Sequence, residues 1–72
     1  MTKGLVYKHK NNKTVAMQVL TSYYVPERDR WSLRVLWYKY SPTRGLEYCI
    51  NISQRLTITK EQRKGWELLQ DV

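Results

Sequence analysis

The side chains that could catalyse a reaction are few in this sequence and lie apart from one another. The single histidine, His9, stands between two lysines, and the single cysteine, Cys49, falls among the polar positions of a predicted strand. General base catalysis needs an oriented partner, and a nucleophilic thiol needs a cationic neighbour and an access path. The spacing supplies neither, and the carboxylates form no recognisable dyad. The sequence therefore predicts a protein that is not an enzyme.

Bound metals and cofactors are not expected either. One cysteine and one histidine cannot provide the ligand set of a structural zinc site. The three glycines are spread along the chain, so no glycine-rich loop is present that could cradle a phosphate. The sequence predicts neither a metal nor a cofactor.

The basic residues are the strongest chemical signal, and they are unevenly placed. Lysine and arginine number 13 against 6 acidic residues, which gives a formal net charge of +7. Residues 1–44 contain nine bases and two acids, whereas residues 45–72 contain four of each, so the excess lies in the first part. A polarised excess favours a polyanionic partner: nucleic acid first, an acidic protein surface second and anionic lipid last.

Alternating apolar and polar residues predict the strands that must position these charges. The predicted strands cover residues 4–9, 14–24, 31–40 and 46–58, the last being one long bent strand or two that meet at residues 53–54. We expect the odd positions of 14–24 to face the core, together with the odd positions of 31–37 and the even positions of 46–58. Such one-sided alternation is typical of antiparallel sheets.

The C-terminal part contains a helix signal. Thr59 and Gln62 have the spacing of a capping box. The favoured interpretation is a helix from Lys60 to about Gln70, although Gly65 in its middle costs about 1 kcal/mol relative to Ala. The alternative is a single helical turn that ends at Gly65, followed by a short strand from Trp66 to Leu69.

These elements predict one domain, residues 1–72, that is mainly β. The expected architecture is a small curled antiparallel sheet or an SH3-like barrel of four or five strands, with a short C-terminal helix. No run of apolar residues is long enough to span a membrane, and no signal peptide is recognisable. We therefore expect a cytoplasmic protein without a membrane partner.

The candidate binding surface is the sheet face opposite the predicted core. We expect Arg34, Tyr38 and Tyr40 to be exposed there at alternate positions, with Tyr24 near them. The expected rim of this surface consists of basic residues, namely Lys8, Lys10, Arg28 and Arg30. Aromatic rings can stack on bases while cations neutralise phosphates. Nucleic acid, either DNA or RNA, is therefore the expected partner.

A protein partner is the alternative hypothesis, because Tyr, Trp and Arg are also the residue types that dominate protein interfaces. The chain would then be an adaptor or inhibitor, for example a phage-type protein that acts on a host enzyme. The sequence leaves open whether the nucleic acid is single- or double-stranded and whether the chain forms oligomers.

Overall fold

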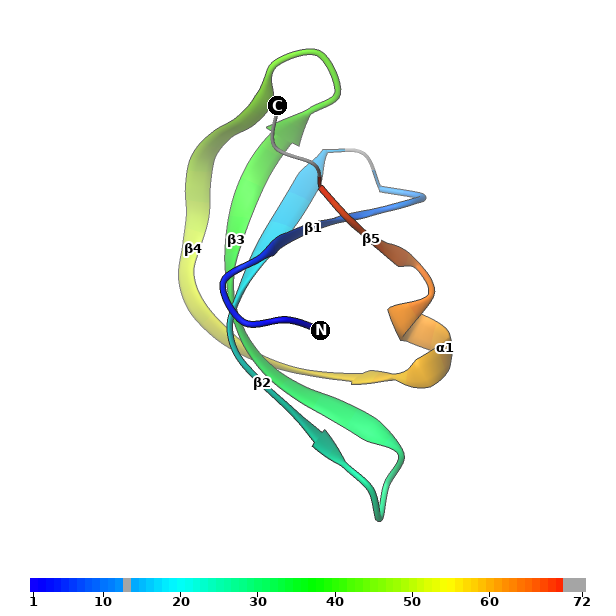
Figure 1. Cartoon of the computed structure of the whole chain (residues 1–72). Coiled ribbons are helices and arrows are strands. Elements are labelled where there is room, and N and C mark those ends of the chain that lie inside the picture. The colour runs from blue at the N-terminus through cyan, green and yellow to red at the C-terminus, as the bar shows by residue number, and fades with distance from the viewer. Residues whose placement is uncertain (13, 70–72) are drawn as a thin grey trace.

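Five antiparallel strands form one strongly curled sheet in the computed structural model of the chain (Figure 1). The structure describes residues 1–12 and 14–69, with only the backbone for residues 51 and 52. The elements along the chain are β1 (Val6–His9), β2 (Val15–Val25), β3 (Arg30–Ser41), β4 (Gly45–Thr59), α1 (Lys60–Arg63) and β5 (Trp66–Leu68).

The strand order in the sheet is β4-β3-β2-β1-β5. The first four strands follow one another as antiparallel neighbours, and β5 then pairs with the free side of β1. The sheet order makes β4 and β5 the two edges, so the described strands are not closed into a barrel. The prediction of a mainly β, antiparallel fold is therefore confirmed. No helix in the described part of the chain is long and apolar enough to cross a membrane.

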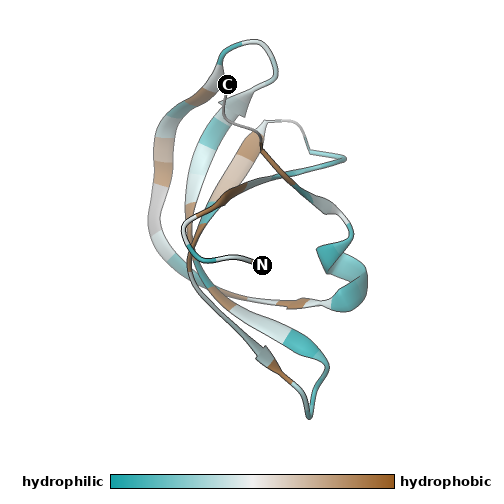
Figure 2. Cartoon of the chain, viewed as in Figure 1, coloured by the Kyte–Doolittle hydropathy of each residue, from teal (hydrophilic) through white to brown (hydrophobic). Residues whose placement is uncertain are grey.

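The hydrophobic core lies on the concave side of the sheet, which we call the inner face. Its buried residues come from the N-terminus and from β1 to β4: Met1, Tyr7, Met17, Val19, Leu33, Val35 and Ile58. Partly buried hydrophobic residues pack against this cluster: Trp31, Trp37, Leu56 and Trp66. Figure 2 shows hydrophobic residues on β1, β2 and β5, the strands that enclose the centre of the molecule. Leu33 and Val35 belong to this cluster, and Trp31 and Trp37 pack against it. The predicted inward odd positions of β3 are therefore confirmed.

An irregularity in β2 changes which residues face the core. The pairing of β2 with β3 shifts between Val19 and Thr21, which leaves Leu20 as an extra residue. One extra residue moves every later side chain to the other face of the sheet. The odd positions therefore face inward as far as Val19, but the same prediction is wrong for Thr21 and Tyr23. Both point outward and are exposed.

The first half of β4 is not covered by the core. The pairing of β3 with β4 shifts at three places, and at each of them β4 contributes the extra residue. Leu46, Tyr48 and Ile50 are exposed, although their even positions predicted burial. Leu56 and Ile58 further along the strand do pack against the core as predicted. The alternation predicts burial correctly only where another part of the chain covers the strand.

The C-terminal part follows the alternative interpretation. The capping box is confirmed: Thr59 accepts the N–H of Gln62 at 3.1 Å, and the Gln62 side chain accepts the N–H of Thr59 at 2.9 Å. The helix ends at Arg63, however, so the predicted helix is wrong from residue 64 onward, and residue 70 itself lies outside the described residues. The free edge of β1 instead pairs with Trp66–Leu68.

Gly65 is expected to tolerate no side chain. A Cβ atom there would lie 2.8 Å from His9 Nε2 and 3.3 Å from the carbonyl oxygen of Gln62. The His9 ring cannot retreat freely, because its Nδ1 accepts the N–H of Asn11 at 3.1 Å. We expect Gly65→Ala to lower the free energy of unfolding by about 1–3 kcal/mol in urea denaturation. The exposed neighbour change Lys64→Ala is the control, and equal stability of the two variants would contradict this packing.

Candidate functional site

A groove on the outer, convex face of the sheet lies next to the hairpin between β2 and β3. Its floor is one cross-strand row, in which Tyr23, Ser32 and Thr57 are direct neighbours on β2, β3 and β4. Ser32 and Thr57 are short, whereas Tyr23 stands at the end of the row. The groove has a volume of about 330 Å³ and is lined by Tyr23, Val25, Arg28, Arg30, Ser32, Arg55 and Thr57.

Arginines stand on both sides of that row. Arg30 lies in the adjacent row toward the hairpin, and Arg28 comes from the hairpin loop. Arg55 lies in the adjacent row on the other side, directly opposite Arg34 on β3. All four side chains are exposed. We call this surface the arginine groove and these four residues the groove arginines.

Within the part of the chain that the structure describes, no groove arginine forms a salt bridge. Four salt bridges occur within residues 1–12 and 14–69, and none includes a groove arginine. They join Lys8 to Glu67 (3.4 Å), Arg44 to Glu47 (4.0 Å), Lys60 to Asp29 (3.2 Å) and Lys64 to Glu61 (3.2 Å). Glu27 is the other acidic residue in this part of the chain, and it is exposed in the hairpin loop. The positive charge of the groove is therefore open to an external anion.

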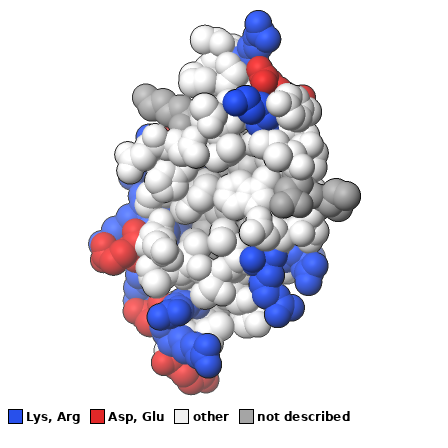
Figure 3. Space-filling view, turned by 180° about the vertical axis from the view of Figure 1, so that it is seen from behind, with Lys and Arg blue, Asp and Glu red and all other residues white. Residues whose placement is uncertain are grey.

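Basic side chains lie at both ends of the face seen from behind, and the groove arginines belong to the lower end. Figure 3 shows Lys and Arg side chains over the lower part and at the top of the molecule as seen from behind, with acidic side chains beside them at the lower left and bottom, while the middle of that face is uncharged. The lower end is the one that carries the β2–β3 hairpin in Figure 1. A positive region of this kind attracts polyanions by long-range electrostatics.

The pair formed by Arg34 and Arg55 is unfavourable for the sheet itself. Like charges directly opposite each other on neighbouring strands destabilise the pairing by about 0.2–1 kcal/mol. Arg34 is held in place by a hydrogen bond that its Nη1 donates to Ser53 Oγ at 3.2 Å. A bound anion between the two guanidinium groups would remove the repulsion.

Three predicted binding residues lie in or beside the groove, whereas its other lining residues, among them Arg55 and Tyr23, are not predicted from the sequence. Arg28, Arg30 and Arg34 belong to the groove arginines, as the expected basic surface requires. The charge distribution does not point to Arg55, because the residues after 44 are neutral as a whole. The alternation predicts a core position for Tyr23, because the sequence offers no signal for the irregularity at Leu20.

The structure places Tyr24 on the inner face, so the prediction that it lies near Arg34 is wrong. Its ring is 5.2 Å from that of Trp31. Its hydroxyl donates to Asp29 Oδ1, and Lys60 Nζ lies 5.9 Å from the ring centroid. The extra residue in β2 is the cause, because it moves Tyr24 to the face opposite Tyr23.

The remaining predicted residues lie away from the groove, toward the far end of β3. Tyr40 is only 8% exposed, so its predicted exposure is wrong, and Lys8 Nζ lies 6.0 Å from its ring centroid. Tyr38 is half-buried, and its hydroxyl donates to Gln18 Oε1 at 3.4 Å. Lys8 is engaged with Glu67, and Lys10 is exposed on the segment after β1. Tyr38 and Tyr40 therefore cover the outer side of the sheet and are not joined to the groove arginines.

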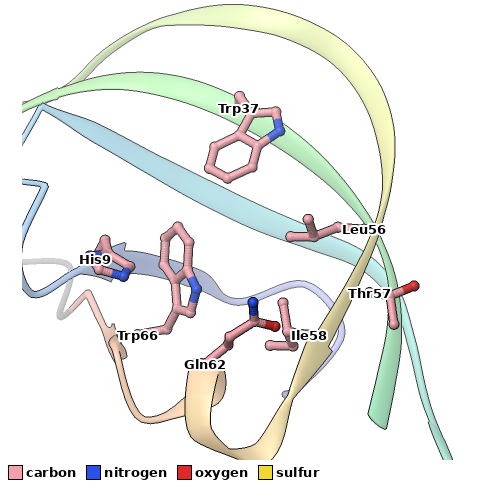
Figure 4. A pocket seen from close by; sticks show the side chains of 7 residues that line it. All are labelled: His9, Trp37, Leu56, Thr57, Ile58, Gln62 and Trp66. Atoms are coloured by element: carbon pink, nitrogen blue, oxygen red, sulfur yellow. The ribbon is translucent and has the colours of Figure 1, made fainter.

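A second cavity, of about 250 Å³, lies between β4 and β5 on the inner face. Figure 4 shows its lining residues, which are His9, Trp37, Leu56, Thr57, Ile58, Gln62 and Trp66. The Trp66 ring packs between those of His9 and Trp37. Its centroid lies 4.9 Å from the His9 ring centroid and 5.8 Å from that of Trp37. Most of these residues also belong to the core or pack against it. We therefore assign this cavity to the open side of the core.

Within the described residues, no group of three or more His, Cys, Asp or Glu side chains is placed to hold a metal ion. Comparisons with protein-family models, curated proteins and solved structures gave no match. Function therefore has to be inferred from the chemistry of the arginine groove itself.

Proposed function

We propose that the chain is a non-enzymatic module that binds nucleic acid in the arginine groove. The observation that carries the proposal is the set of four arginines around a polar floor, none of them in a salt bridge within the described residues. Guanidinium groups match phosphate geometry and form charge-assisted hydrogen bonds with it. Hydroxyl groups such as those of Ser32 and Thr57 are also common phosphate partners.

The pairing of the strands supports a related proposal about the fold. β1 pairs with both β2 and β5, as in a small barrel, and among the described strands only the pairing between β4 and β5 is missing. We propose that the sheet is an open variant of an SH3-like barrel. Its curvature gives the outer face the convex shape on which the arginine groove lies.

The test is the salt dependence of binding to labelled DNA and RNA oligonucleotides, measured by fluorescence anisotropy. We expect the logarithm of the affinity to fall linearly with that of the salt concentration between about 50 and 200 mM. The variant Arg55→Gln should lower the magnitude of the slope by about 0.7–0.9, because it removes one phosphate contact.

The matched control is Arg44→Gln, which removes the same charge from the exposed hairpin between β3 and β4. Its slope should equal that of the unmodified chain. Absence of binding at about 50 mM salt, where phosphate contacts are strongest, would refute the proposal. Equal effects of the two substitutions would show that net charge matters and the groove does not.

A protein partner is the second candidate, and the first half of β4 favours it. Leu46, Tyr48 and Ile50 are exposed on an edge strand of the sheet. Exposed hydrophobic residues and free strand edges are typical of surfaces that bind other chains. An adaptor or inhibitor would retain its partner in a pull-down after nuclease treatment, whereas loss of every partner would exclude it.

A further inference from the structure

Tyr23 presents an open aromatic ring at the side of the arginine groove. Its side chain is 63% exposed, the largest value among the exposed large hydrophobic residues of the described chain. Its neighbour in the same row is the short Ser32, which leaves the space beside the ring unfilled. The ring therefore offers a flat surface directly beside the groove arginines.

An exposed ring of this kind discriminates between single-stranded and double-stranded nucleic acid. The bases of a duplex already stack on one another, so stacking one of them on a protein side chain first costs a few kcal/mol for unstacking it. Bases of a single strand can be splayed out, and they stack on aromatic residues with little dependence on sequence. A ring beside arginines is thus useful for an unpaired base and superfluous for duplex phosphates.

The rows of the sheet place the charges on both sides of the ring. Arg30 lies in the row on one side of Tyr23, and Arg34 and Arg55 share the row on the other. Rows on one face of a strand are about 7 Å apart. The phosphates before and after a nucleotide bound at Tyr23 can therefore each meet a guanidinium group.

We propose that the arginine groove binds single-stranded nucleic acid, with an unpaired base stacked on the Tyr23 ring and the flanking phosphates held by the groove arginines. This inference rests on the proposed function and narrows its ligand from nucleic acid in general to unpaired strands. Tyr23 is then the residue that selects the ligand, and the groove arginines provide most of the affinity.

The experiment compares Tyr23→Ala with Tyr23→Phe on a labelled single strand and on the duplex of the same sequence. Tyr23→Ala should weaken binding to the single strand by about 5- to 100-fold and change duplex binding by less than about 2-fold. Tyr23→Phe should keep the single-strand affinity because the ring is retained. A fluorescent base analogue in the strand should be quenched by the chain and by Tyr23→Phe, and not by Tyr23→Ala.

Tyr48→Ala is the matched control, because Tyr48 is 60% exposed and lies outside the groove. It should leave both affinities unchanged, and circular dichroism should show that all variants are folded. Equal losses for single strand and duplex with Tyr23→Ala, or no loss at all, would overturn the stacking inference. In that case a reduced salt slope with Arg55→Gln would still support the proposed function, whereas failure of the unmodified chain to bind either ligand would refute both.

Discussion

Replacing all four groove arginines by glutamine is expected to lower the affinity for single-stranded nucleic acid by about 100- to 1,000-fold. Each charge-assisted hydrogen bond contributes on the order of 1 kcal/mol or more, and tenfold in affinity corresponds to about 1.4 kcal/mol. The magnitude of the salt slope should fall by about 3, because four guanidinium groups no longer neutralise phosphates. Fluorescence anisotropy over a series of salt concentrations measures both quantities.

The matched variant removes four exposed cations outside the groove: Lys3, Lys10, Arg44 and Lys64. It has the same net charge, so it isolates the placement of the arginines from the total charge of the chain. We expect it to retain most of the affinity. Equal losses in the two variants would show that the chain attracts polyanions only through its overall charge.

The groove variant should also fold at least as stably as the unmodified chain. Arg34 and Arg55 face each other across β3 and β4, and their repulsion disappears when both become neutral. The expected gain is about 0.2–1 kcal/mol in the free energy of unfolding. If the arginines form a binding surface, the substitutions should weaken binding without lowering stability. If their role is purely structural, the substitutions should lower both.

Truncation of Leu33 to alanine is expected to destabilise the fold more than any surface change. Leu33 is 2% exposed, and it lies in the core cluster with Met17 and Val35. A buried Leu→Ala substitution costs about 2–5 kcal/mol, because it removes hydrophobic packing and leaves a cavity. A domain of this length has a total stability of only about 4–11 kcal/mol, so a large fraction would be lost. Urea denaturation measures the change.

Leu46→Ala is the matched control for this truncation. The alternation along β4 predicts a core position for Leu46, yet the structure leaves it 41% exposed. We therefore expect a cost within about 0.5 kcal/mol, as for other surface substitutions. A cost for Leu46→Ala as large as that for Leu33→Ala would mean that the first half of β4 is covered in solution.

Local patterns in the sequence determined much of the fold. The alternation in β3 identified Leu33 and Val35 as core residues, and the spacing of Thr59 and Gln62 identified the helix start. The antiparallel, mainly β architecture followed from one-sided alternation and short turns. These features depend on neighbours within a few residues, so the order of residue types is sufficient to predict them.

The candidate site was predicted only in part, because its composition depends on pairing between distant segments. The extra residue at Leu20 exposes Tyr23 and turns Tyr24 inward, and it is visible only from the register against β3. Arg55 joins Arg34 because β4 pairs with β3, although the two residues are far apart along the chain. The composition also does not say which lysines form salt bridges. Lys8 lies next to Glu67 only because β5 pairs with β1.

The sequence by itself thus determined that the chain forms an antiparallel sheet with an excess of positive charge. The tertiary structure alone decided which face carries the groove arginines and which tyrosine accompanies them. The physical reason is that side chains alternate with a period of two along a strand. A single irregularity in pairing, stabilised by neighbours far away in the sequence, reverses every assignment that follows it.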